Sequence, residues 1–447
     1  MKNIQKDFDK AKNKSILFLG KFHSLNVDEI KLFLEQFDVT YTDVLTDEVV
    51  MFVESTIISP LEEEIAYTAY KQNIPNYRAN QFEELYADAL NSDSILMSLK
   101  LSNNQERLAR LLQNMHLDNR LFLKLFNMYD WQEEGLFDNS ENMEVCTLFA
   151  KRFYHKERFD PATFYSPISI FEIGIMSDNP EVLEVLLTLP DISVKQSRSK
   201  EKRPTNLKEA LATNNSINEK TFNYLVRLND KDVDYFLATS SLLNDKVEDI
   251  LYGRSDEIIK MQLATNPNIS DEIFNKLKDD KNIQSTLFSY QPIDSKRFEN
   301  IEDLHPDIGM NENLSGDVIQ KLIDRKDRDI LSMLCANESI GWDYLQQMQE
   351  EKFYPYLASN KNLKNLQELY EKNDRAIDIE LAANPATPAK ILKELFNRDD
   401  FEINKSLAIN ESMMIEDLQQ LQLDTRLLNY LKENETFTKN LLNNLGI

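Results

Sequence analysis

A short motif, Leu-Ala-x-Asn, recurs through the second half of the chain and constrains the fold more than any other feature. Clear copies are "LATN" at 263–266 and "LAAN" at 381–384. With the first residue of the motif as an anchor, the anchors recur at intervals of 21 to 26 residues. The anchors are Leu211, Leu237, Leu263, Leu287, Ile308, Leu334, Leu357, Leu381, Leu407 and Leu431. Such a period is typical of repeat proteins, whose units bury their apolar faces against one another.

Three further columns of apolar residues accompany the anchors. Positions four residues before each anchor are all apolar, and positions six and fourteen residues after it are apolar except for Thr387 and Glu371. An offset of four residues places two side chains on one face of a helix. The repeat therefore predicts a first helix ending near the anchor, a turn, and a second helix. Small residues just after the anchor, such as Gly309 and Ala382, predict close approach of neighbouring helices.

Polar residues mark the expected start of the second helix. Asn218 precedes "EK", Ser270 precedes "DE", and Thr387 is followed by Pro388. Side-chain oxygens of such residues accept hydrogen bonds from the free amides of a first helical turn, and proline fits that turn. We expect all three polar residues to cap their helices.

An asparagine three residues after the anchor is the most regular polar feature of the repeat. The column contains Asn214, Asn266, Asn311, Asn337, Asn360, Asn384, Asn410 and Asn434. Ser240 and Tyr290 stand at the exceptional positions. A polar ladder could coordinate a ligand, but backbone groups at helix ends need hydrogen-bond partners wherever water is excluded. We therefore interpret these asparagines as structural residues of the turns.

The units "LATNPNISDEIFNKL" and "LAANPATPAKILKEL" resemble the leucine-rich repeat variant family. The resemblance covers about residues 205–447 and implies a solenoid of two-helix repeats. Some members of that family hold an iron-sulfur cluster with cysteines, but the only cysteines here are Cys146 and Cys335. The resemblance therefore implies no cluster in this chain. Residues 91–204 follow the pattern only in places, with Leu101, Asn104, Leu112 and Met115 at repeat-like offsets, and predict degenerate helical units.

Residues 1–90 have a different sequence pattern from the repeats. Two β-prone runs, "SILFLGKF" and "VVMFVEST", alternate with "VDEIKLFLEQF" and "PLEEEIAYTAYKQN", which have helical spacing. Together with "VTYTDVL", "IPNY" and "QFEELYADAL", they give the order strand, helix, strand, strand, helix, a short apolar stretch, helix. This order predicts a small α/β domain with a largely parallel sheet.

That order, with "FLGKF", "IAYTAYKQNIPNY" and "NQFEELYADAL", resembles a BRCT domain over about residues 13–90. The usual paired glycines are replaced by "QFDVT", and Phe82 stands where a tryptophan is usual. The resemblance implies a protein-interaction module. Phosphopeptide binding in that family needs Ser or Thr before the first-strand glycine and a lysine in the second helix. This chain has Leu19 before Gly20, and Glu62 to Glu64 begin the helix, so that activity is not expected to carry over.

Charge argues against broad binding of nucleic acid. The formal net charge is −25, whereas phosphate-backbone affinity depends on Lys and Arg displacing counterions. One segment, "VKQSRSKEKRP", is basic. It contains Lys195, Arg198, Lys200, Lys202 and Arg203. We interpret it first as a solvated loop and, alternatively, as an interaction loop that could contact DNA.

The sequence offers no recognisable catalytic motif. His23, His116, His155 and His305 are scattered, without the spacing that places two metal ligands on one helix face. The chain lacks GxGxxG, GxxxxGK and GxSxG motifs. We therefore expect no cofactor, no metal and no enzymatic activity. A catalytic site between domains is the alternative, and no motif supports it.

The sequence thus predicts a mainly helical chain in three parts: a BRCT-like domain at 1–90, degenerate helical units at 91–204, and a solenoid at 205–447. We expect a cytoplasmic, noncatalytic adaptor or scaffold with a protein partner and no membrane attachment. An accessory factor in DNA repair or replication, recruited through the BRCT-like domain, is the second hypothesis.

Overall fold

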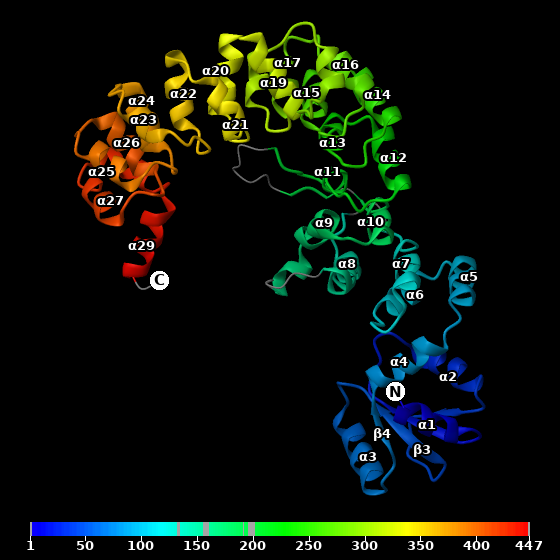
Figure 1. Ribbon diagram of the computed structural model, residues 1–447. Coiled ribbons are helices and arrows are strands. Elements are labelled where there is room, and N and C mark those ends of the chain that lie inside the picture. Colours follow the sequence, from blue (N-terminus) through cyan, green and yellow to red (C-terminus); the bar gives the residue numbers. More distant parts are fainter. Residues whose placement is uncertain (1, 132–134, 155–160, 191, 195–201, 446–447) are drawn as a thin grey trace. The chain divides into compact units, whose positions relative to one another are not determined.

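The computed structural model describes residues 2–131, 135–154, 161–190, 192–194 and 202–445. The chain divides into two compact units, Met1–Phe236 and Leu237–Ile447. It is mainly helical, with one small parallel sheet near the N-terminus (Figure 1). The predicted fold class, a small α/β domain followed by helices, is confirmed at this level.

The sheet has four parallel strands in the order β2-β1-β3-β4. The strands are β1 (Ser15–Leu19), β2 (Thr40–Thr42), β3 (Val49–Glu54) and β4 (Asn76–Arg78). The helices that follow them are α2 (Val27–Glu35), α3 (Pro60–Lys71) and α4 (Ala79–Ala89). The element order and a largely parallel sheet were predicted from the alternation of apolar runs and helical patterns, but β4 was expected only as a short apolar stretch.

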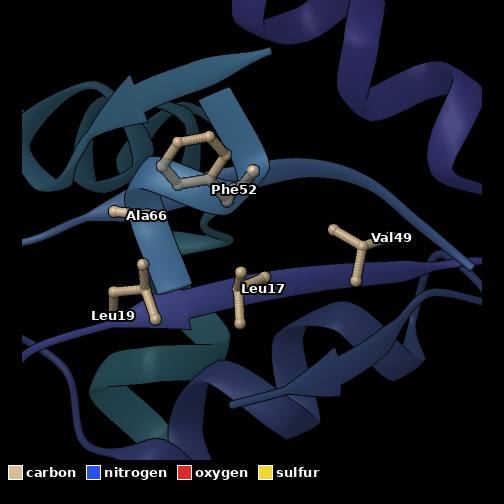
Figure 2. Packing of buried hydrophobic residues seen from close by; sticks show 6 residues of the cluster. Leu17, Leu19, Val49, Phe52 and Ala66 are labelled. Carbon is tan, nitrogen blue, oxygen red and sulfur yellow. The ribbon is translucent and has the colours of Figure 1, made fainter. Parts of the chain in front are cut away.

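Both faces of the sheet are covered, which explains why β1 is an uninterrupted apolar run. On one face, Leu17, Leu19 and Phe52 pack with Ala66 of α3 (Figure 2). Aromatic rings fill the core elsewhere in the domain: the ring centroid of Phe82 in α4 lies 4.9 Å from that of Phe18. Phe82 is fully buried, so it fills the core at the position where the resemblance expects a tryptophan.

An N-terminal helix, α1 (Lys2–Phe8), also belongs to this domain and was not predicted. Its ring at Phe8 lies 6.0 Å from the ring of Phe33 in α2. The hydroxyl of Tyr77 in β4 donates a hydrogen bond to Asp7 at 2.6 Å. Ile4 and Phe8 are both buried, and their spacing of four residues was the signal among the charged residues that could have revealed the helix.

Residues 91–236 add further helices to the first unit. They are α5 (Ser92–Ser102), α6 (Gln105–Leu112), α7 (Asn119–Phe126), α8 (Ser140–Phe153), α9 (Pro167–Met176), α10 (Pro180–Leu186), α11 (Leu207–Ala212) and α12 (Glu219–Leu228), and α13 (Lys231–Leu237) crosses into the second unit. The prediction that Leu101 and Met115 stand at positions of the repeat is wrong. Their side chains are 81% and 45% exposed, whereas Leu111 is buried and occupies the anchor position.

In the second unit, first and second helices alternate along the chain. The first helices are α15 (Glu257–Thr265), α17 (Gln284–Tyr290), η3 (Pro306–Met310), α20 (Arg328–Ala336), α22 (Tyr354–Ser359), α24 (Arg375–Ala383), α26 (Phe401–Ile409) and α28 (Leu428–Leu431). The second helices are α14 (Asp245–Gly253), α16 (Asp271–Leu277), α18 (Ser295–Glu299), α19 (Gly316–Arg325), α21 (Trp342–Leu345), α23 (Leu366–Tyr370), α25 (Ala389–Phe396), α27 (Ile415–Leu421) and α29 (Glu435–Leu445).

Each first helix packs against the first helix of the next repeat, as the run α20, α22, α24 and α26 shows in Figure 1. All ten anchors, from Leu211 to Leu431, have 0% exposure. The anchor column is therefore the core of the helix pairs. Gly309 lies where η3 meets α20, and a Cβ atom there would come within 2.6 Å of the Ile330 carbonyl oxygen. The predicted close approach after the anchor is confirmed at this position.

The capping predictions are confirmed at two positions and wrong at the third. Asn218 accepts from the Thr221 amide at 2.8 Å, and Ser270 accepts from the Ile273 amide at 3.3 Å. The Thr387 hydroxyl instead donates to the carbonyl of Leu381 at 2.7 Å. Helix α25 therefore begins after Pro388 without a side-chain cap.

Candidate interaction surface

The repeated asparagines form a ladder of hydrogen bonds between successive repeats. The Asn384 side-chain amide donates to the carbonyls of Ala358 and Asn360, at 2.8 and 3.1 Å. Its carbonyl oxygen accepts from the Ala386 amide at 2.8 Å, within its own turn. Equivalent donor bonds to the preceding repeat are made by Asn266, Asn311, Asn337, Asn360, Asn410 and Asn434. In the first unit, Asn214 donates to carbonyls of Gly174, Ile175 and Ser177.

These asparagines have no donor left for a ligand. Each has two amide hydrogens, and both are directed at backbone carbonyls at the end of a helix of the preceding unit. The ladder asparagines are at most 5% exposed. Their arrangement is that of structural turn residues.

Two members of the ladder were missed in the sequence. Next to the exception Tyr290, the side-chain amide of Gln291 donates to Ala264 and Asn266, at 2.8 and 2.7 Å. Asn114, three residues after Leu111, donates to the Glu83 carbonyl at 3.0 Å and ties α6 to the α/β domain. The signal for Gln291 was an amide displaced by one residue, and the signal for Asn114 was a Leu-x-x-Asn outside the regular array.

A column of aspartates seven residues before the anchor was also missed. Asp374, for example, accepts from the amides of Ala376 and Ile377, at 2.8 and 3.3 Å, and so caps α24. The other capping members in the second unit are Asp256, Asp327, Asp400 and Asp424. Their carboxylates also interact favourably with the positive end of the helix dipole. Part of the negative charge of the chain is therefore structural.

Second helices of neighbouring repeats are linked by ion pairs. Lys276 in α16 lies 2.7 Å from Asp249 in α14, and Lys321 in α19 lies 3.1 Å from Glu299 in α18. Lys393 in α25 likewise pairs with Asp417 in α27. Many charges on this side of the repeats are thus paired within the chain.

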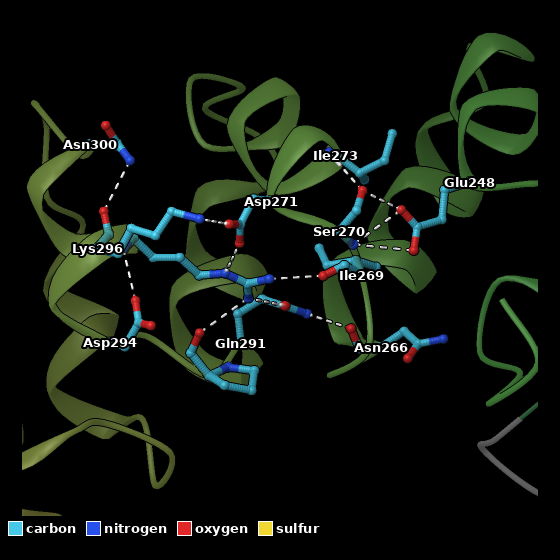
Figure 3. A network of polar contacts seen from close by, with 12 residues as sticks. Glu248, Asn266, Ile269, Ser270, Asp271, Ile273, Gln291, Asp294, Lys296 and Asn300 are labelled. Atoms are coloured by element: carbon cyan, nitrogen blue, oxygen red, sulfur yellow. Dashed lines mark hydrogen bonds and ion pairs between the residues drawn. The ribbon is translucent and has the colours of Figure 1, made fainter. Parts of the chain in front are cut away.

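Arg297 in α18 has hydrogen-bond acceptors at all three of its guanidinium nitrogens. Its Nε atom donates to Asp271 at 3.0 Å, and an Nη atom donates to the Ile269 carbonyl at 2.8 Å. The other Nη atom donates to Gln291 at 3.2 Å. Figure 3 shows this network around Asp271, Ile269 and Gln291. The adjoining cavity of about 560 Å³ is therefore lined by a guanidinium that already has its partners.

The first helices present a different surface, which we call the first-helix face. It consists of the residues five, two and one before each anchor and two after it, from α15 to α28, and these offsets share one side of a helix. Large apolar side chains on it are exposed. They are Ile258 (48%), Met261 (37%), Met310 (45%), Tyr356 (43%) and Ile409 (40%).

Charges on the first-helix face are mainly negative once internal pairs are counted. Lys405 lies 3.5 Å from Glu402, and Lys352 lies 2.8 Å from Glu350. Arg426 lies 2.6 Å from Asp424. Among the residues that the structure describes, no basic side chain forms a salt bridge with the remaining carboxylates of this face. These are Asp303, Asp329, Glu380 and Glu433.

The basic segment is only partly covered by the structure. Lys195, Arg198 and Lys200 lie outside the described residues. Lys202 is held by Asp232, at 2.5 Å, and its ammonium lies 4.6 Å from the centre of the Tyr235 ring. Arg203 is exposed. Of this group, Lys202 is therefore already engaged with an acid and an aromatic ring.

In the α/β domain, a carboxylate of the same chain accepts a hydrogen bond from the backbone amide that follows β1. The Gly20 amide donates to Glu62 at 2.8 Å, and the Ser59 amide donates to the same carboxylate at 2.7 Å. These hydrogen bonds, chiefly those from Ser59, lower the pKa of Glu62. The anionic group that accepts from the Gly20 amide is thus a side chain of the same chain. Leu19, beside it, is buried in the core.

Both cysteines lie buried in the described part of the chain. Burial raises the pKa of Cys335 to about 12 and raises that of Cys146, which leaves both thiols protonated at neutral pH. Across the described ranges, no three His, Cys, Asp or Glu side chains are placed to hold a metal ion. Within the same ranges, no helix combines the length and apolarity needed to cross a bilayer.

Comparisons with protein-family models, with curated proteins and with solved structures found no match to this chain. The geometry of the surfaces is therefore the basis for a functional proposal.

Proposed function

We propose that this chain is a noncatalytic protein-binding adaptor whose repeats stack as a helical solenoid and whose first-helix face contacts the partner. The supporting observation is the row of exposed apolar side chains on that face, from Ile258 to Ile409. Apolar side chains that recur exposed along one face favour protein binding, and aromatic residues such as Tyr356 are enriched where binding energy is concentrated.

The contrast between the two sides of the repeats favours the same surface. Second helices use Lys276, Lys321 and Lys393 in ion pairs with neighbouring repeats. The first-helix face, by comparison, carries both exposed apolar groups and four carboxylates that form no salt bridge with a basic side chain of the described residues. The BRCT-like domain is a docking module in this proposal and not a phosphopeptide reader, because the Glu62 carboxylate already accepts from the Gly20 amide.

Affinity purification of the full chain from cell extract, with mass spectrometry, tests this proposal. The test variant carries Met310→Ser, Tyr356→Ser and Ile409→Ser, which remove apolar contacts without disturbing buried anchors. Its matched control carries Leu423→Ser, Leu441→Ser and Leu442→Ser, three exposed leucines outside the first-helix face.

We expect the unmodified chain and the control to recover the same stoichiometric partner. Loss of contact residues of this kind weakens the free energy of binding by about 2 kcal/mol or more. The test variant should therefore recover the partner at least roughly tenfold less well. Absence of any stoichiometric partner, or equal recovery by both variants, would contradict the proposal.

A further inference from the structure

We infer that the segment bound by the first-helix face is a positively charged, flexible stretch of the partner in which apolar side chains alternate with Lys or Arg. This inference rests on the proposed function, because it names the chemistry of the partner for the same face. It follows from the order of side chains along the face and from the charges that the chain leaves unpaired.

Three neighbouring first helices present different chemistry at the same position, one residue before the anchor. Met333 lies on α20, Tyr356 on α22 and Glu380 on α24, and these helices pack in that order. An apolar group, an aromatic ring and a carboxylate therefore follow one another across the face. The columns that form the core do not vary in this way.

The spacing of these groups suits an extended chain. Packed helices lie about 8–10 Å apart, and an extended strand advances about 3.3 Å per residue. Every third residue of an extended partner would therefore lie over the next helix. A partner with apolar residues and Lys or Arg at such intervals could place the cation over Glu380 and an apolar side chain over Tyr356.

Among the carboxylates without a salt bridge on this face, Glu380 is the one whose charge is destabilised by burial. Its side chain is half-buried, and burial raises its pKa because the charged form is incompletely solvated. No described Lys, Arg or His forms a salt bridge with it. An incoming ammonium or guanidinium would supply the missing charge in a partly shielded place, where ion pairs are stronger than in open water.

The surrounding charges favour the same partner over a polyanion. Within the described part of the chain, Asp329 and Glu433 also form no salt bridge with a basic side chain, while Lys352, Lys405 and Arg426 are each paired with a carboxylate. A phosphate backbone or an anionic lipid surface would meet net negative charge here. A basic protein segment would be attracted and oriented.

The test uses the full chain and a fluorescent synthetic peptide of repeating Leu-Ser-Ser-Lys-Ser-Ser sequence, titrated by fluorescence anisotropy. This repeat places Leu and Lys three residues apart, over successive first helices. Peptides of repeating Leu-Ser-Ser-Glu-Ser-Ser and Ser-Ser-Ser-Lys-Ser-Ser separate the contributions of charge and apolar side chains. Glu380→Gln removes the carboxylate of interest. Glu299→Gln makes the same change in net charge on the second-helix side and is the matched control.

We expect the Leu-Ser-Ser-Lys-Ser-Ser peptide to bind, and the peptides with Glu in place of Lys or Ser in place of Leu to bind at least tenfold more weakly. Glu380→Gln should weaken binding about tenfold, whereas Glu299→Gln should change it less than about twofold. Thermal unfolding should show that Glu380→Gln is as stable as the unmodified chain or more stable, so that lost binding cannot be assigned to misfolding.

Equal weakening by the two Gln variants would overturn the inference, because it would show general attraction between a basic peptide and an acidic chain. Unchanged binding by Glu380→Gln would also overturn it. If the cellular partner is lost from the Met310, Tyr356 and Ile409 serine variant but retained by Glu380→Gln, the adaptor proposal stands and only the charge inference fails.

Discussion

Leu381→Ala will lower the free energy of unfolding by about 3 kcal/mol, within the range of about 2–5 kcal/mol for buried leucines. Leu381 has 0% exposure, and its helix α24 packs between α22 and α26. The substitution removes buried methyl groups and leaves a cavity that packed neighbouring helices cannot fill completely. The change is measured by urea unfolding followed by circular dichroism.

Leu423→Ala is the matched control for this prediction. Leu423 is 85% exposed, so its truncation should change the free energy of unfolding by less than about 0.5 kcal/mol. Equal effects of the two substitutions would show that the anchor column does not form the core of the repeats.

Asn384→Ala is expected to lower the free energy of unfolding by about 2–4 kcal/mol. The substitution removes both bonds and leaves the Ala358 carbonyl without its side-chain partner in a place shielded from water, while the Asn360 carbonyl keeps only its bond from the Leu363 amide, at 3.2 Å. A buried polar group without a partner costs about 1–3 kcal/mol. The same unfolding measurement gives the result, with Asn397→Ala, at an exposed helix end, as the control.

A comparison with Asn384→Asp sharpens this test. Aspartate has nearly the same shape, but its carboxylate cannot donate to the two carbonyls. We therefore expect Asn384→Asp to be at least as destabilising as Asn384→Ala. A neutral effect of either substitution would mean that the ladder does not hold the repeats together.

The repeat was predictable because its core positions obey one rule in every unit. Each unit must bury an anchor such as Leu381 and must satisfy the same carbonyls at the end of its first helix, so the same residue types recur. Gln291 escaped prediction because an amide one residue farther along reaches the same carbonyls. The prediction that Thr387 caps α25 was wrong because a hydroxyl can donate to a carbonyl as readily as it can accept from a helix amide.

The α/β domain was predictable from its alternation of strands and helices, but its contacts were not. Helix α1 is held by Phe8 and Asp7 against residues far along the chain. Glu62 was expected to repel a phosphate, whereas its specific bonds to Gly20 and Ser59 become visible only in three dimensions. Sequence spacing gives local structure more readily than it gives such long-range partners.

The candidate surface could not be located from the sequence because its positions share no residue type. Met333, Tyr356 and Glu380 stand at the same offset on neighbouring helices, and no pattern search would group them. Similarly, Lys202 belonged to a conspicuous basic cluster, but its pairing with Asp232 could not be read from its neighbours. The exposed fractions of these side chains and their ion pairs are properties of the folded chain.

We propose that the repeated residues hold the units together and that the first-helix face binds another protein. Photo-crosslinking in cells can locate the bound surface, with a photoreactive amino acid placed at Tyr356 or, as a control, at Lys390, an 84% exposed side chain on the second helix α25. We predict a discrete protein adduct from position 356 and none from position 390. An adduct from position 390 alone, or from neither position, would contradict the claim.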